Sequence, residues 1–156
     1  MNNREMTPTA QAARRPIERL GAVDIYRHYL SEVLAEVLET TAPMAPGLER
    51  LCAGMEAYWE ACYTRRHARL RVMREINSPG TDQVLLRLSR PFGYLLHSEL
   101  EHGGCANALT QAWVLFAELR GIAQDEARSG KRHLHQRAQL QRRIRERIAG
   151  GVPTKQ

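Results

Sequence analysis

The stretch Ile17–Glu39, IERLGAVDIYRHYLSEVLAEVLE, decides the fold because its apolar residues recur every three or four positions. That spacing, seen at Ile25, Tyr29 and Val33, is typical of one apolar face of an α-helix. The pattern predicts a helix from Asp24 to about Thr40, followed by a break at the proline-containing segment 41–47.

Upstream of this helix, the residue types predict a separate short helix. Pro16 suits the first turn of a helix and Gly21 suits a stop, which gives a helix over Ile17–Gly21. The preceding Met1–Arg15 is polar and has no periodic pattern, so it is expected to be a tail.

Helical spacing continues to the end of the chain, and alternating strand-like patterns are absent. We expect an all-α bundle of five to seven helices over residues 24–150, with residues 1–23 and 151–156 outside it. The predicted helices are residues 48–76 with a short break at 65–67, residues 81–102 with a kink or split at Pro91, residues 107–129, and residues 132–149.

Composition describes a globular chain. The 156 residues are 43% hydrophobic and 26% charged, and they fit one domain. No apolar run approaches the roughly 20 residues of a membrane span, and the N-terminus lacks the apolar core of a signal peptide. We therefore expect a cytoplasmic protein with no membrane partner, whose Cys52, Cys62 and Cys105 are free thiols.

Positive charge is concentrated near the C-terminus. The net charge is +6, and residues 131–147 hold seven Lys or Arg residues against one Glu. Such a run is typical of a solvated helix face, and the alternative is a patch that binds nucleic acid. A third interpretation is a helical adaptor whose basic last helix docks an acidic partner, through Arg137, Arg142 and Arg143.

The segment after Gly21 resembles one known bacterial family. Tyr26, Arg27, His28 and Tyr29, followed by Ser31-Glu32 and a leucine-bearing helix, are similar to the turn that ends the DNA-recognition helix of TetR/AcrR transcriptional regulators. Gly21 resembles the glycine of the helix-turn-helix. The spacing from Gly21 to Tyr26 is about two residues shorter than the family pattern, and only sixteen residues precede Ile17.

The resemblance implies a sensor domain with an incomplete helix-turn-helix at residues 1–23. Tyr26, Arg27 and His28 would be the remnant of its DNA contacts, and DNA binding is uncertain. The resemblance also implies a homodimer, or a heterodimer with a full-length relative, joined through the last two helices. The interface residues would be Trp113, Leu115, Leu119, Ile122, Leu134, Ile144 and Ile148.

The family binds small apolar effectors inside the bundle, in pockets lined by aromatic and methionine side chains. Residues of these types at helical spacing either fill the core or line such a pocket. The candidate pocket residues are Met55, Tyr58, Trp59, Cys62, Tyr63, Met73, Phe92, Leu96, Trp113 and Phe116.

No motif in the sequence predicts catalysis or a cofactor. Phosphate loops, nucleophile elbows and HExxH metal sites are absent. His97, Glu99, Glu101 and His102 are interpreted as a polar helix end because His97 and Glu101 share a helix face while His102 turns away. His28 and Glu32, four residues apart, are expected to form a surface pair. The sequence predicts a regulator or regulator-derived sensor and no enzyme.

Overall fold

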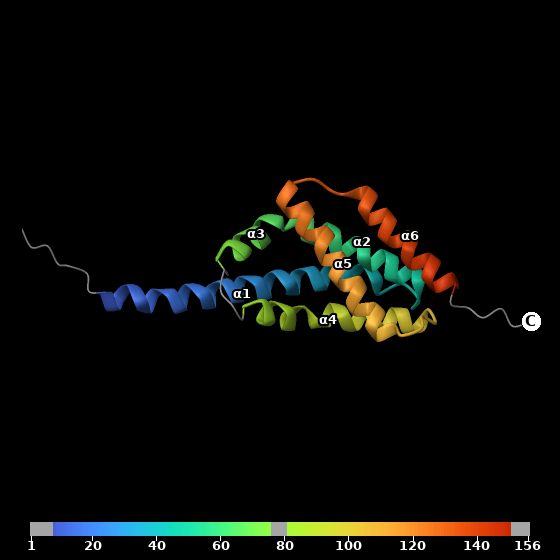
Figure 1. Ribbon diagram of the computed structural model, residues 1–156, viewed down its shortest axis with the longest axis horizontal. Coiled ribbons are helices and arrows are strands. Elements are labelled where there is room, and N and C mark those ends of the chain that lie inside the picture. Colours follow the sequence, from blue (N-terminus) through green and yellow to red (C-terminus); the bar gives the residue numbers. More distant parts are fainter. Residues whose placement is uncertain (1–7, 76–80, 151–156) are drawn as a thin grey trace, which may run out of the picture.

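The computed structural model describes the backbone of residues 8–75 and 81–150, and the side chains of residues 21–74 and 83–150. These residues form six helices and no strand, which confirms the predicted all-α bundle (Figure 1). The helices are α1 (Pro8–Thr41), α2 (Leu48–Thr64), α3 (Arg66–Glu75), α4 (Thr81–His102), α5 (Ala108–Ser129) and α6 (Leu134–Gly150).

Helix α1 is one continuous helix of 34 residues, so the predicted stop at Gly21 and the separate helix Ile17–Gly21 are wrong. A glycine inside a helix costs only about 1 kcal/mol relative to alanine, which the helical residues on both sides outweigh. The predicted tail was also too long, because α1 begins at Pro8. Its first turns extend past the other helices (Figure 1).

The buried face of α1 carries Tyr26, Tyr29, Val33 and Val37. These residues are three or four positions apart, so they lie on one side of the helix and pack mainly against α2. Each large apolar side chain buried in this way contributes roughly 1.5–3 kcal/mol relative to an exposed one. Leu38, one position after Val37, is exposed.

The predicted break near residues 65–67 is confirmed. Helix α2 ends at Thr64 and α3 begins at Arg66, while the Arg65 backbone N–H still donates to the Ala61 carbonyl. The Arg65 side chain forms ion pairs with Glu32 and Glu36 of α1. The junction between the two helices is therefore tied to α1. The predicted stop at Ser78–Gly80 lies outside the described residues.

Helix α4 continues without interruption through Pro91, whose side chain is exposed, so the predicted split is not found. Two residues later, Gly93 allows α4 and α5 to approach closely. A Cβ atom at Gly93 would lie 2.6 Å from the Trp113 ring on α5. A larger residue at this crossing would force the Trp113 ring to move.

Helices α5 and α6 form the C-terminal hairpin, and their predicted boundaries are confirmed to within two residues. Asn107 precedes α5, and Gly130 ends it in the left-handed conformation with φ 68°. Helix α6 buries Leu140, Ile144 and Ile148 against the rest of the bundle.

Candidate functional site

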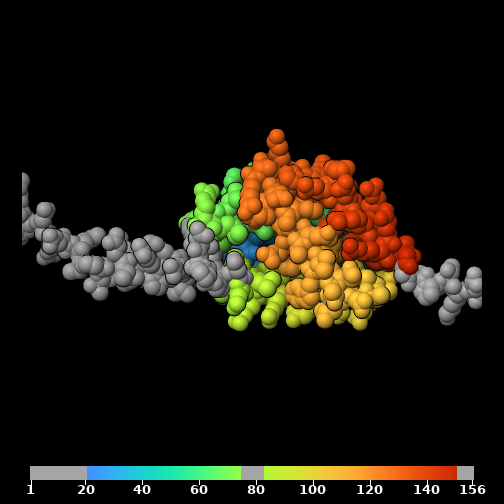
Figure 2. Space-filling view, viewed as in Figure 1, coloured from blue at the N-terminus to red at the C-terminus, as the bar shows by residue number. Residues whose placement is uncertain are grey.

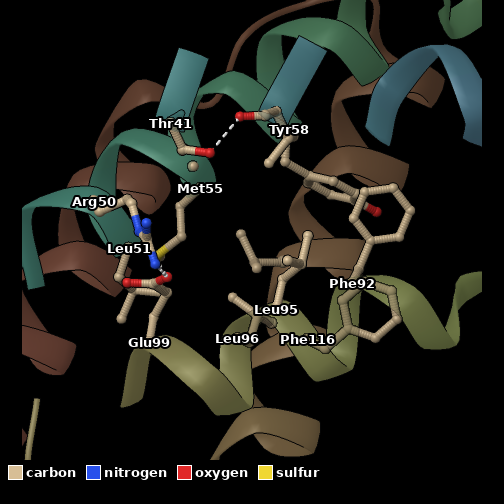
Figure 3. Close-up of a pocket in the computed structure, with 13 residues that line it drawn as sticks. Thr41, Arg50, Leu51, Met55, Tyr58, Phe92, Leu95, Leu96, Glu99 and Phe116 are labelled. Carbon is tan, nitrogen blue, oxygen red and sulfur yellow. Dashed lines mark hydrogen bonds and ion pairs between the residues drawn. The ribbon is translucent and has the colours of Figure 1, made fainter. Parts of the chain in front are cut away.

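An apolar cavity lies inside the bundle between α1, α2, α4 and α5 (Figure 3). Its free volume is about 50 Å³. Apolar side chains form most of its wall, with one pair of charged residues. The lining residues are Val37, Thr41, Arg50, Leu51, Gly54, Met55, Tyr58, Phe92, Leu95, Leu96, Glu99, Phe116 and Leu119.

Three aromatic rings pack together on one side of the cavity. The Tyr58 ring meets the Phe92 ring edge-on at 5.3 Å between centroids, and the Phe92 and Phe116 rings stack at 6.0 Å. Such pairs prefer offset-stacked or edge-to-face geometry and gain about 0.5–1.5 kcal/mol beyond their burial. Burial raises the pKa of the Tyr58 hydroxyl, so this wall carries no charge near neutral pH.

An ion pair forms the other end of the cavity. The Arg50 Nε donates to Glu99 Oε1 at 2.7 Å, and the Gly47 backbone N–H donates to Glu99 Oε2 at 2.9 Å. Hydrogen bonding to Glu99 raises the pKa of Arg50. Thr41, also at this end, donates its hydroxyl to the Val37 carbonyl of its own helix at 2.8 Å. The cavity therefore joins a neutral aromatic wall to a polar end whose charges are already paired.

Half of the predicted pocket residues line this cavity, namely Met55, Tyr58, Phe92, Leu96 and Phe116. The other five lie elsewhere. Trp59 and Cys62 fill the core, and the Trp59 ring N–H donates to the Leu119 carbonyl at 3.2 Å. Tyr63 donates to the Gly130 carbonyl, Trp113 packs over Gly93, and Met73 lines a different cavity near α3.

Sequence reasoning missed the polar end of the cavity. Glu99 was interpreted as part of a polar helix end, and Arg50 was not considered. The two residues are 49 positions apart, so only the packing of α2 against α4 brings them together. The lining residues Gly54 and Thr41 carried no signal either, because neither is aromatic or strongly apolar.

Four of the seven predicted interface residues are buried within this chain. Leu115, Leu119, Ile144 and Ile148 belong to the core, because α5 packs mainly against α4 and α2, and α6 packs against α2 and α5. Trp113 and Ile122 are partly buried, and Leu134 is 62% exposed. The exposed apolar residues of α5 are Leu109 and Val114. A partner can contact these and Leu134, but not the four core residues.

Of the three residues predicted as a remnant of DNA contacts, Tyr26 lies in the core, and Arg27 and His28 lie on the surface. Tyr26 is buried and stacks on Tyr29 at 5.7 Å between ring centroids, so it is a packing residue. Arg27 is exposed and pairs with Asp24 at 3.0 Å. His28 and Glu32 form the predicted exposed pair, with 3.6 Å between Nε2 and Oε1.

Most of the arginines on α6 pair with acidic or amide side chains of the same chain. Arg145 pairs with Glu49, Arg143 with Glu118, and Arg147 donates to Gln111. Arg132, just before the helix, pairs with Glu60 at 2.9 Å. The basic run therefore fastens α6 to α2 and α5, and much of its charge is balanced locally.

Arg137 also belongs to these contacts between α6 and the rest of the bundle, and it is only 2% exposed. Its Nε and Nη2 atoms donate to the two carboxylate oxygens of Glu126 at 2.7 Å each, and Nη1 donates to Glu56 and Glu60 at 2.8 and 2.6 Å. Because the Arg137 guanidinium is enclosed, the proposed docking of an acidic partner on this residue does not fit.

The histidine and glutamate residues near the end of α4 do not converge. Glu99 is bound to Arg50 and Gly47, and His102 contacts the Ser98 carbonyl of its own helix at 2.9 Å. Across the part of the chain that the structure describes, no group of three or more His, Cys, Asp or Glu side chains is arranged to hold a metal ion.

Comparison of the chain with family models, curated proteins and solved structures finds no match. Among the described helices, none combines the length and apolar character needed to cross a bilayer.

Proposed function

We propose that this chain is the sensor domain of a TetR-like transcriptional regulator, or is derived from one, and binds a small apolar effector inside its bundle. The observation that carries the proposal is the apolar cavity lined by Met55, Tyr58, Phe92, Leu96 and Phe116. Ligand sites are concave, mostly apolar and equipped with a few polar groups. The Arg50–Glu99 pair supplies such groups at one end.

The cavity volume implies that binding changes the shape of the bundle. An apolar cavity of about 150 Å³ is known to bind benzene, whereas this one has about 50 Å³. The ligand-free chain therefore represents a closed state, and an effector would be accommodated by movement of α4 away from α1 and α2. A ligand that binds the widened state better shifts the population toward it. A sensor requires such a second state.

Helix α1 connects the cavity to the N-terminal end of the chain. Val37 and Thr41 line the cavity, and the same continuous helix extends past the bundle at its other end. A shift of α1 caused by an effector would be carried along the rigid helix to whatever it contacts there. In this proposal, that contact is with DNA or with a DNA-binding partner subunit.

The proposal includes a homodimer with two-fold symmetry. Its support is a set of exposed apolar side chains on consecutive helices: Tyr94 on α4, Leu109 and Val114 on α5, and Leu134 on α6. In the proposal, exposed residues of this set take the place of the four core residues that the sequence predicted as interface. The proposal retains the C-terminal helices as the interface.

Benzene binding measured by calorimetry and thermal unfolding tests the ligand site. We expect benzene to raise the melting temperature of the wild-type chain, and Leu96→Phe to remove the effect because the larger ring fills the cavity. Leu109→Phe is the matched control, since Leu109 is exposed and outside the cavity. Equal benzene binding by the Leu96→Phe variant, or none by the wild type, would refute the proposed site.

A further inference from the structure

A second and larger cavity opens between α1, α3, α4 and α5. Its volume is about 500 Å³, within the roughly 300–1,000 Å³ typical of ligand sites. Figure 2 shows a hollow in this face of the molecule, with α1 visible at its floor between α3, α4 and α5. The two cavities share no lining residue.

Three arginines line the second cavity, and none of its described lining residues is acidic. Arg120 and Arg128 come from α5, together with Gln124, at four-residue spacing along one helix face. Arg69 comes from α3 on the opposite side. Positive charge from two helices thus converges on one space.

Arg69 is 5% exposed, and its contacts are neutral. Its Nε donates to Gln124 Oε1 at 2.8 Å, and Nη1 lies 3.5 Å from the Tyr29 hydroxyl. Burial raises the pKa of the Tyr29 hydroxyl and of the Cys62 thiol beside it, so neither supplies negative charge near pH 7. An arginine remains protonated under these conditions.

Arg137 shows how this chain neutralises a buried guanidinium when the role is structural. That residue is enclosed by Glu126, Glu56 and Glu60. Arg69 is buried to a similar extent, but no carboxylate contact to it occurs among the described residues. A buried charge without a partner costs several kcal/mol, so the contrast identifies Arg69 as a cation that lacks its anion.

Arg120 adds an independent observation at the same cavity. Its Nε is buried and has no hydrogen-bond partner in the described structure, while its guanidinium lies 5.8 Å from the Phe116 ring centroid. A buried donor left unpaired costs about 1–3 kcal/mol. An acceptor bound in the cavity would satisfy this donor and neutralise Arg69 together.

We propose that this cavity binds an amphipathic organic anion, whose carboxylate or phosphate is held by Arg69, Arg120 and Arg128 and whose hydrocarbon part lies on the apolar wall. Tyr26, Met73 and Leu85 supply that wall. The planar guanidinium group matches both carboxylate and phosphate geometry. This site goes beyond the proposed apolar effector and does not depend on it.

Calorimetry with three probes that share an eight-carbon chain tests the inference: sodium octanoate, octyl phosphate and 1-octanol. We expect octanoate or octyl phosphate to bind and to raise the melting temperature. The probe that binds more tightly identifies the headgroup that the cavity prefers. Uncharged octanol should bind at least tenfold more weakly, because it leaves Arg69 without a counter-ion. Binding should also weaken as salt concentration rises.

Substitutions then assign the binding to this cavity. We expect Arg120→Gln combined with Arg128→Gln to weaken anion binding at least tenfold, and Arg90→Gln, an exposed arginine outside the lining, to leave it unchanged. Gly121→Leu should block the cavity while the chain stays folded, because a Cβ there meets nothing within 4 Å.

Octanol binding equal to octanoate binding, anion binding that survives the double substitution, or no binding of any probe at 10 mM would overturn the inference. Benzene binding in the first cavity should be unaffected by the arginine substitutions. Failure of this site is therefore distinguishable from failure of the proposed function.

Discussion

At the scale of single residues, two buried arginines carry opposite roles in this chain. Arg137 is enclosed by carboxylates and holds α6 in place, whereas Arg69 faces neutral groups beside a cavity. The sequence predicted neither role. Both residues lie in polar stretches, and whether an arginine is buried depends on which helices pack over it.

Removing the Arg137 side chain should strongly destabilise the fold. Arg137→Ala removes the ion-pair partner of Glu126, which is 0% exposed and would keep only the hydrogen bond from the His133 backbone N–H, and we expect a loss of about 3–5 kcal/mol. Urea unfolding followed by circular dichroism measures it. Arg142→Ala is the control, because Arg142 is exposed and should cost less than about 0.5 kcal/mol. Equal losses in the two variants would contradict a structural role for Arg137.

Acid should weaken the attachment of α6. Hydrogen bonding to Arg132 and then to Arg137 lowers the pKa of Glu60 below its ordinary value of 4.5, and hydrogen bonding to Arg145 does the same for Glu49. A lowered folded-state pKa contributes stability above pH 4.5 that is lost as pH falls through the folded value. We expect the melting temperature to fall below about pH 4.5, and to fall less steeply in Glu60→Gln. A pH-independent melting temperature between pH 6 and 3 would exclude this linkage.

At the scale of helices, the sequence pattern predicted which segments are helical, but it predicted only some of the helix boundaries correctly. The helix boundary at Gly130 and the break after Thr64 were predicted, because a left-handed glycine and a basic cluster are local signals. Gly21 and Pro91 gave similar signals but interrupt no helix. Whether a helix continues through such a residue depends on the surrounding residues and packing, and a local pattern cannot weigh these.

The continuity of α1 can be tested at Gly21. This residue is exposed inside the helix, and an added Cβ meets nothing within 4 Å. Gly21→Ala should therefore stabilise the fold by about 1 kcal/mol, which thermal unfolding detects. If Gly21 instead ended a short helix in a left-handed conformation, the same substitution would lower the melting temperature.

At the scale of the whole molecule, the all-α bundle was predicted because helical spacing runs through most of the chain. The cavity was predicted only in part. Residue type identified Tyr58, Phe92 and Phe116, which form the aromatic wall of the cavity. It could not distinguish these lining residues from Trp59 and Cys62, which fill the core. The paired charges and the second cavity arise from contacts between helices that are distant in sequence.

Assembly of the molecule depends, in the proposal, on the exposed apolar residues of α5. Val114 is 45% exposed, so Val114→Glu should leave the fold intact while placing a charge in the interface. We expect wild type to be a dimer and Val114→Glu a monomer in light scattering coupled to size-exclusion chromatography. A monomeric wild type, or a variant that remains dimeric, would contradict this interface.

Methionine methyl NMR can distinguish the two cavities of different chemistry that we propose for this bundle. Met55 lines the apolar cavity and Met73 lines the arginine-rich one. We expect benzene to shift the Met55 methyl resonance more than that of Met73, and octanoate to shift the Met73 resonance more than that of Met55. If both ligands shift the same methyl group more strongly, or neither ligand shifts either group, the proposal of two ligand sites is wrong.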